Sequence, residues 1–199
     1  MAEEFFDAAA LAAVVDALPD GANLVVGNSL PIRHLDQFVR PDAKDLRLFG
    51  NRGASGIDGV VSTALGVAAA DPSRPTVLLI GDISFYHDLN GLLAVGQHGL
   101  DRITIVLFHN DGGSIFRRLP IQGQEPAFTN LFLTPHGLDF APVVGMYGLD
   151  YVQTTYQTGL NTALSTVFAG ELPTVIEVRT DGAQDELHRR RVAKAAKNA

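Results

Sequence analysis

Short apolar runs recur along this chain and alternate with longer segments whose apolar residues repeat at helical spacing. Short continuous apolar runs are typical of strands buried on both faces of a sheet. The runs that predict strands are NLVVG, LRLFG, TVLLIGD, RITIVLFHN, DYVQ and PTVIEVRT. The segments that predict helices are 5–18, 29–39, 57–71, 85–99, 140–147, 158–169 and 183–199.

This alternation predicts an α/β fold with three layers, in which helices cover both faces of a six-stranded parallel sheet. A long loop is expected from 111 to 138, and the absence of a linker or repeat predicts one domain over 1–199. In open parallel sheets, ligands bind beyond the carboxyl ends of the strands, near the point where strand order reverses. The polar segments GNS, GNRG, GD and HNDGG follow predicted strands and therefore mark the edge where a site is expected.

The amino-acid composition argues against several classes of function. The chain has 199 residues and a formal net charge of -7, which argues against a nucleic-acid binder that relies on phosphate attraction. It has no cysteine, which excludes disulfides, thiolate zinc sites and cysteine nucleophiles. The acidic start MAEEFF does not fit a signal peptide, and no apolar run approaches the ~20 residues of a membrane span. We expect a soluble, cytoplasmic protein.

Two polar residues at predicted strand ends suggest a metal site. Asp82 ends one predicted strand and Asn110 ends the next, 28 positions later. If the strands are neighbours, a carboxylate, an amide oxygen and a loop carbonyl meet there, and this set suits Mg²⁺, with Mn²⁺ as an alternative. Gly81 would let the backbone approach a phosphate group, and Ser84 could donate its hydroxyl there. Gly-Asp alone is more often a turn or a helix cap.

The segment GDIS followed by NDGG resembles the Gly-Asp…Asn signature of thiamine-diphosphate enzymes. The resemblance implies that Asp82, Asn110 and the main-chain carbonyl of Gly112 coordinate a magnesium ion, which in turn binds the diphosphate. It also places Gly81, Ser84 and Gly113 beside the cofactor. One departure is visible, because His109 stands where the family usually has a further asparagine.

A wider set of segments resembles the family of 2-succinyl-5-enolpyruvyl-6-hydroxy-3-cyclohexene-1-carboxylate synthases, which are transferases of menaquinone biosynthesis. The segments are GNSLPIRHLD, NRGASGIDGVVSTALGVA, GDISFYHDLNGLL, NDGGSIFRRLP, LFLTPHGLDF and VIEVRTD. They cover nearly the whole chain but match only the C-terminal, diphosphate-binding third of those enzymes. The resemblance implies that 2-oxoglutarate is decarboxylated and that the succinyl carbanion equivalent is added to isochorismate, with thiamine diphosphate and Mg²⁺ as cofactors.

The same resemblance assigns substrate and cofactor contacts. It implies that Ser29, Arg33 and Arg52 contact the substrate, and a guanidinium group does bind carboxylates in a bidentate fork. It implies an apolar wall around the reacting carbon, and a bulky residue that props thiamine in its bent shape. The wall residues are Ile115, Phe116 and Leu119, and the prop is Ile57. From the residues alone, a helix cap, surface arginines and core packing explain the same positions.

We expect structural or surface roles for three histidines and for the basic segment near the C-terminus. We expect a structural role for His87 and surface positions for His136 and His188. The segment HRRRVAK is expected to be a solvated helix face.

Members of the resembled family also carry a pyrimidine-binding domain and a middle domain. A glutamate of the pyrimidine-binding domain hydrogen-bonds the cofactor ring. No segment of these 199 residues resembles either domain. We therefore expect the chain to be inactive alone, and to form a homodimer or to pair with a separate pyrimidine-binding subunit. Two alternatives stay open: another thiamine-diphosphate decarboxylase or synthase, or a non-catalytic module that binds a phosphorylated ligand.

Overall fold

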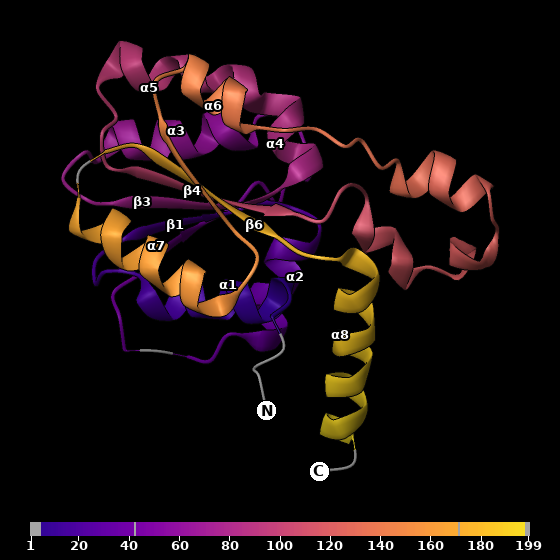
Figure 1. Cartoon of the computed structure of the whole chain (residues 1–199). Coiled ribbons are helices and arrows are strands. Elements are labelled where there is room, and N and C mark those ends of the chain that lie inside the picture. The colour runs from indigo at the N-terminus through magenta and orange to yellow at the C-terminus, as the bar shows by residue number, and fades with distance from the viewer. Residues whose placement is uncertain (1–4, 42, 171, 198–199) are drawn as a thin grey trace.

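The computed structural model describes residues 5–41, 43–170 and 172–197. Six strands form one parallel sheet in the order β2-β1-β3-β4-β6-β5 (Figure 1). Their bounds are Asn23–Val26 (β1), Arg47–Phe49 (β2), Thr76–Gly81 (β3), Ile103–His109 (β4), Asp150–Thr154 (β5) and Thr174–Arg179 (β6). The predicted α/β fold with a six-stranded parallel sheet is confirmed.

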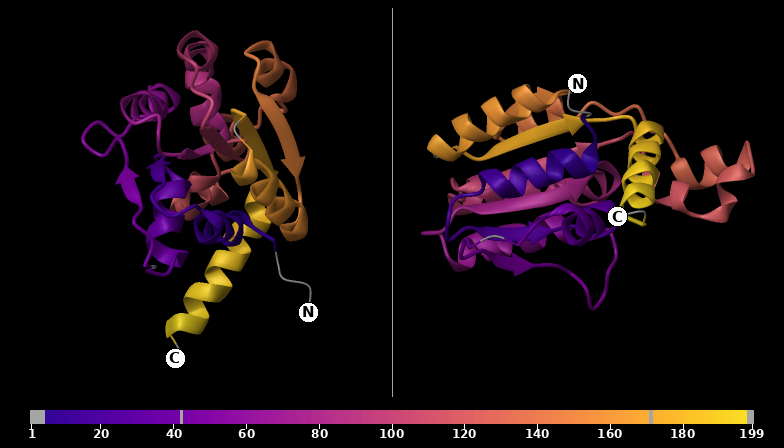
Figure 2. Two further views of the ribbon diagram at one scale, coloured as in Figure 1. Left: turned by 90° about the vertical axis from the view of Figure 1, so that its left-hand side faces the viewer. Right: turned by 90° about the horizontal axis from the view of Figure 1, so that it is seen from below.

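Helices cover both faces of this sheet, as Figures 1 and 2 show. On one face, α3, α4, α5 and α6 pack over side chains such as Leu78 and Ile105. On the other face, α1, α2 and α7 pack over side chains such as Leu79 and Val106. The helices are Asp7–Ala17 (α1), Leu30–Phe38 (α2), Val60–Ala70 (α3), Asp82–Asp88 (α4), Leu93–His98 (α5), Ala141–Met146 (α6), Gln157–Ala169 (α7) and Gly182–Lys197 (α8).

The strand order reverses between β1 and β3. From β1 the chain moves outward to β2 and then returns to the other side of β1, where β3 pairs with it. β3 then pairs in register with β4 from Thr76 opposite Ile103 to Gly81 opposite Phe108. The carboxyl ends of β1, β3 and β4 are therefore neighbours at the reversal point, where open parallel sheets bind ligands.

The helix expected over 85–99 is wrong as one continuous element. α4 begins earlier, at Asp82, and a 3₁₀ turn, η1 (Leu89–Leu92), separates it from α5. At this break Gly91 approaches α3 so closely that a Cβ on it would lie 2.8 Å from Ser62 Oγ. This close approach to α3 is a contact between distant segments, which the local apolar pattern does not show.

The loop expected from 111 to 138 contains three short helical turns. They are η2 (Ser114–Arg118) and η3 (Pro120–Gly123), both 3₁₀, and a π turn, η4 (Thr129–Leu133). The turns form the arm on the right of Figure 1. None of the helices in the described parts of the chain is long and apolar enough to cross a membrane.

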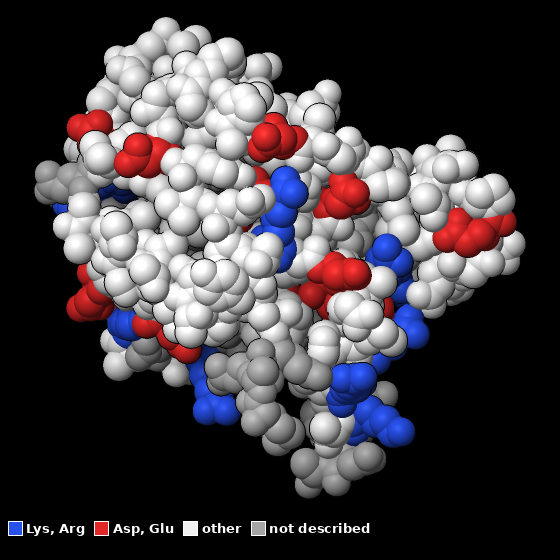
Figure 3. Space-filling view, in the orientation of Figure 1, with Lys and Arg blue, Asp and Glu red and all other residues white. Residues whose placement is uncertain are grey.

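Charged side chains are unevenly distributed over the face shown in Figure 3. They are sparse at the top, over α5 and α6, while Lys and Arg atoms gather over α8 and the segment beside it. The basic segment predicted to be a solvated helix face is exposed from residue 190 to 195.

Candidate functional site

Asp82 and Asn110 leave the sheet at the same edge, because β3 and β4 are paired neighbours. Both residues line one cavity of about 200 Å³. The cavity brings together most of the residues that the sequence singled out. These are Ser29, Ile57, Gly81, Asp82, Ser84, Asn110, Gly112, Gly113, Ile115 and Phe116.

The carboxylate of Asp82 is buried, with only 2% of the residue exposed. Its Oδ1 accepts the N–H of Ile83 at 2.7 Å, and its Oδ2 accepts the N–H of Gly112 at 2.9 Å. Burial raises the pKa of Asp82, and the hydrogen bond from Gly112 works in the opposite direction. A cation bound beside this carboxylate would offset the free-energy cost of burying its charge.

The side-chain amide of Asn110 has one satisfied end and one open end. Its Nδ2 donates to Asp7 Oδ2 at 2.8 Å. Its Oδ1 is buried and, within the described part of the chain, has no hydrogen-bond partner. Buried polar atoms are nearly always paired, so this oxygen is suited to accept a ligand, such as a metal ion.

Only glycine fits at position 112. Its φ is 131°, and a Cβ on it would lie 2.1 Å from the carbonyl oxygen of Leu133. Its carbonyl accepts the N–H of Ser114 at 2.9 Å and keeps a second lone pair. Asp82, Asn110 and this carbonyl offer oxygen atoms only, so the site fits a hard cation such as Mg²⁺.

The surface position expected for His136 is wrong. Its side chain is 13% exposed, it stacks on His109 with ring centroids 5.2 Å apart, and its Nε2 lies 3.3 Å from Asp82 Oδ2. The ligand atoms of Asp82, His109 and His136 lie within 4.8 Å of one another. However, the N–H of Leu138 donates to His136 Nδ1, so a neutral ring carries its proton on Nε2. This tautomer cannot coordinate a metal through Nε2.

His109 has a partner inside the sheet. Its Nδ1 lies 2.9 Å from Oε1 of Glu177, which is fully buried on β6. Tyr151 and Arg179 also donate to the carboxylate of Glu177. Burial raises the pKa of Glu177, but the hydrogen bonds from His109, Arg179 and Tyr151 outweigh it and set the pKa to about 2. Glu177 is therefore a buried anion that fixes His109.

Of the other histidines, the buried His34 on α2 lines the cavity, whereas His188 and His87 do not. His188 on α8 is partly buried and stacks on Phe6, with ring centroids 5.3 Å apart. His87 is exposed. The neighbouring Asp88 accepts hydrogen bonds from the N–H and the hydroxyl of Ser62.

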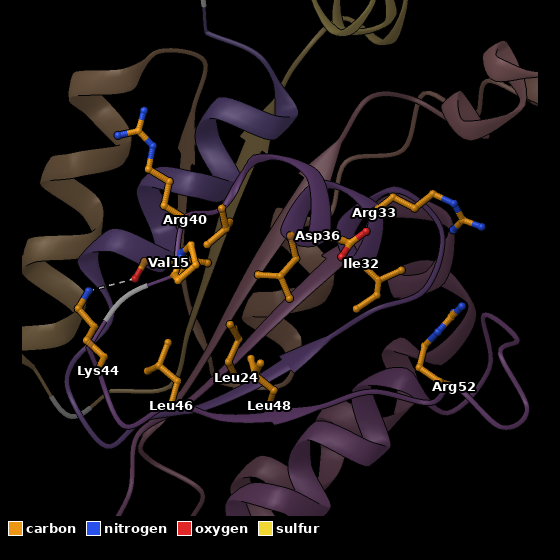
Figure 4. A pocket seen from close by; sticks show the side chains of 13 residues that line it. Val15, Leu24, Ile32, Arg33, Asp36, Arg40, Lys44, Leu46, Leu48 and Arg52 are labelled. Atoms are coloured by element: carbon orange, nitrogen blue, oxygen red, sulfur yellow. Dashed lines mark hydrogen bonds between the residues drawn. The ribbon is translucent and has the colours of Figure 1, made fainter. Parts of the chain in front are cut away.

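Arg33, Arg52 and Leu119 lie outside the cavity of Asp82. The two arginines line a larger groove of about 740 Å³ along α1, α2 and β2. Figure 4 shows both arginines at one end of this groove and Lys44 at the other. Arg33 donates to the carbonyl of Ser29, and Arg52 donates to Asn28 Oδ1, each at 2.7 Å. Leu119 is 44% exposed.

A polar cluster that includes Asp7, a residue of the cavity wall, also escaped the sequence-based analysis. Asp7 on α1 is buried, Thr180 follows β6, and Asp185 lies in the first turn of α8. Burial and the charge of Asp7 raise the pKa of Asp185 to about 9, and burial also raises the pKa of Asp7. The one available signal was an acidic residue within an otherwise apolar helical segment, FFDAAALAAVV.

Curated relatives share most of this chain but are much longer. This chain is 52% identical over 195 residues to the 2-succinyl-5-enolpyruvyl-6-hydroxy-3-cyclohexene-1-carboxylate synthase of Roseiflexus castenholzii. The aligned residues cover 98% of this chain and 33% of that protein. The synthase of Halobacterium salinarum is 48% identical over 182 residues, which cover 92% of this chain and 31% of that protein. The chain thus spans about a third of the length of these relatives.

Solved structures share the fold. A thiamin diphosphate-dependent enzyme from Mycobacterium smegmatis superposes with a TM-score of 0.72 at 23% identity, over 90% of this chain and 32% of that chain. Benzoylformate decarboxylase from Polynucleobacter necessarius gives a TM-score of 0.71 at 23% identity, over 91% of this chain and 34% of that chain. At this level of identity the likeness shows the fold alone.

A sequence model of one protein family matches residues 34–178, which is most of the chain and includes Asp82 and Asn110. The family is described as "Thiamine pyrophosphate enzyme, C-terminal TPP binding domain". This chain therefore belongs to the C-terminal, thiamine-pyrophosphate-binding domain family of the thiamine pyrophosphate enzymes.

Proposed function

We propose that this chain is the diphosphate- and magnesium-binding part of a 2-succinyl-5-enolpyruvyl-6-hydroxy-3-cyclohexene-1-carboxylate synthase. The complete enzyme would decarboxylate 2-oxoglutarate and add the succinyl carbanion equivalent to isochorismate. The observation that carries this proposal is the buried, unpartnered Oδ1 of Asn110 in the same cavity as the buried carboxylate of Asp82. The relatives that bear this synthase's name and share about half of the sequence support the choice of reaction.

In this proposal Asp82, Asn110 and the Gly112 carbonyl hold Mg²⁺ against the diphosphate. Thiamine diphosphate supplies the electron sink that decarboxylation of a 2-oxo acid requires. Gly81 and Gly113 leave space for the phosphate groups, and Ser84 offers a hydroxyl donor from the cavity wall.

Apolar side chains line the rest of the cavity. Ile57, Ile115 and Phe116 belong to its wall, and Phe116 packs edge-on against Phe132 with ring centroids 5.6 Å apart. We assign Ile57 the role of supporting the bent cofactor, and Ile115 and Phe116 that of keeping water from the reacting carbon. Leu119, exposed on this chain, would complete that wall against another part of the enzyme.

Arg33 and Arg52 are assigned to the substrate carboxylates, together with Ser29. Each guanidinium group has five N–H donors. The bonds to the Ser29 carbonyl and to Asn28 therefore leave capacity for a bidentate carboxylate. Because both arginines lie at the end of the groove and outside the cavity, we propose that the substrates bind between this chain and the rest of the enzyme.

The chain matches a third of its relatives, so we propose that turnover requires the remaining parts. The pyrimidine-binding part would come from a second copy in a homodimer or from a separate subunit. Exposed apolar side chains, including Tyr86 and Leu93 at 56% and 55% exposure, support such an association. The cytoplasmic location predicted from the sequence belongs to the same proposal.

Calorimetric titration of the chain with thiamine diphosphate and Mg²⁺ tests the cofactor site. We expect Asp82→Asn to remove magnesium-dependent binding, because the amide replaces the only charged ligand. Asp101→Asn is the matched control, because Asp101 is an exposed acid at the other end of the sheet, beside the start of β4. Equal binding heats for Asp82→Asn and the unchanged chain would refute the site.

A turnover assay tests the need for a partner. We expect no carbon dioxide release from 2-oxoglutarate by the purified chain. Adding the pyrimidine-binding part of a relative should restore release and product formation with isochorismate. Product formation by the chain alone would contradict this part of the proposal.

A further inference from the structure

The amide of Asn110 can serve a cation in only one of its two orientations. Its Oδ1 can coordinate a metal, whereas its Nδ2 carries hydrogens and repels one. The two ends have nearly the same shape, so packing alone does not select between them. The hydrogen-bond partner of the amide must make the selection.

Asp7 is that partner. Its Oδ2 lies 2.8 Å from Asn110 Nδ2. Both carboxyl oxygens of Asp7 accept hydrogen bonds, one from Thr180 and the other from Asn110. Only the Nδ2 end of the Asn110 amide can donate, so Nδ2 faces Asp7 and Oδ1 is left on the opposite side. That oxygen is buried, has no hydrogen-bond partner in the described part of the chain, and belongs to a residue that lines the cavity of Asp82.

Asp7 is itself held in place by distant parts of the chain. The hydroxyl of Thr180 donates to Asp7 Oδ1 at 2.6 Å. The N–H of Asp7 donates to Asp185 Oδ1 at 3.3 Å. Asp7 is 2% exposed, so its carboxylate is shielded from water that could compete for these bonds.

We propose that Asp7 is a positioning residue for the cation site, which fixes the Asn110 amide with Oδ1 toward the bound Mg²⁺. This inference rests on the proposed function for the identity of the cation. Asp7 does not touch the cation and acts only through Asn110. Loss of a partner that orients a metal ligand typically weakens metal affinity about 10- to 100-fold, and we expect an effect of that size.

Two single variants of the full chain separate positioning from general stability. Asp7→Ala removes the acceptor of Asn110 Nδ2, and we expect Mg²⁺ affinity, measured by calorimetry with thiamine diphosphate present, to fall about 10- to 100-fold. Asp185→Asn changes the same buried cluster but keeps an Oδ1 that can accept the N–H of Asp7, and the side-chain hydrogen bonds of Asp185 in this cluster go to Asp7 and Thr180. We expect its Mg²⁺ affinity to stay within about twofold of the original. Unchanged affinity in Asp7→Ala, or equal losses in both variants, would overturn the proposal.

A double variant tests the orientation directly. In Asp7→Asn with Asn110→Asp, donor and acceptor trade places: the amide at position 7 donates to the carboxylate at position 110, whose second oxygen faces the cavity. Affinity should return to within about threefold of the original, which a merely structural role for Asp7 would not produce. This test holds even if Asp7→Ala fails to fold, because lack of rescue in a folded double variant overturns the proposal.

Mn²⁺ as a paramagnetic probe distinguishes failure of this inference from failure of the proposed function. In the unchanged chain, Mn²⁺ should broaden the side-chain amide resonances of Asn110. Without that broadening there is no cation site at Asn110, and both proposals are overturned. Broadening in the unchanged chain, with the same Mn²⁺ affinity in Asp7→Ala, overturns the role of Asp7 alone.

Discussion

Replacing Gly112 with alanine tests how closely two loops meet above the sheet. A Cβ at this position would lie 2.1 Å from the carbonyl oxygen of Leu133, whereas real Cβ contacts essentially never fall below 3.0 Å. The obstacle is backbone, so no side-chain rotation relieves it. The φ of 131° also belongs to a region that residues with a side chain rarely adopt.

The expected cost follows from three contributions. Holding alanine in a sparsely populated backbone region costs about 1–3 kcal/mol. Separating the loops strains two hydrogen bonds, from Gly113 to the Leu133 carbonyl at 2.7 Å and from Gly112 to Asp82 at 2.9 Å. Each is worth about 1 kcal/mol. We therefore expect Gly112→Ala to lower the free energy of unfolding by about 3 to 5 kcal/mol.

Urea unfolding followed by far-ultraviolet circular dichroism measures this loss. Gly123→Ala is the matched control, because it lies in the same loop region, has no atom within 4 Å of its added Cβ and does not have a positive φ. Its free energy of unfolding should change by less than about 0.5 kcal/mol. Equal unfolding midpoints for the two variants would refute the close backbone approach at Gly112.

Two further predictions concern pH. Burial, together with the charges of Arg118 and Arg189, lowers the pKa of His34 from 6.5 to about 4. As the pH is lowered from 6.5 to 4, His34 becomes protonated in the unfolded chain but stays neutral in the folded one. The free energy of unfolding should therefore decrease by at most about 3 kcal/mol over this range, and His34→Gln should remove that decrease in urea titrations. The raised pKa of Asp185, about 9, means that the unfolded chain ionises first, so it lowers stability as pH rises from about 4 to 9. Asp185→Asn should flatten that decline in thermal melts, and an unchanged slope would contradict the burial of its charge.

The sheet and one edge of the site could be predicted from local sequence patterns. Buried strands are recognised as short apolar runs, and polar residues at the end of a strand come directly after such a run in the sequence. Asp82 and Asn110 were placed at one edge on the assumption that their strands are neighbours, and the pairing of β3 with β4 meets that condition. Their roles as metal ligands remain predictions.

The rest of the site depends on contacts between distant segments. Asp7 meets Asn110 across 103 positions and Asp185 across 178. No local sequence pattern predicts these contacts between distant residues. His136 lies in a segment without strand or helix pattern, and only the fold brings its ring onto His109. The groove of Arg33 and Arg52 likewise arises where α1, α2 and β2 pack together.

The direction of α8 has a practical consequence. The helix is held near its start, where Asp185 accepts the N–H of Asp7 and Glu186 lies 3.9 Å from Arg118, and it then runs away from the sheet (Figure 1). Lys194 on its outer part is exposed. A dye or a surface tether attached at this position would sit on a helix that contributes no lining residue to the cavity of Asp82. This helix is therefore a suitable attachment point for measuring ligand binding to that cavity.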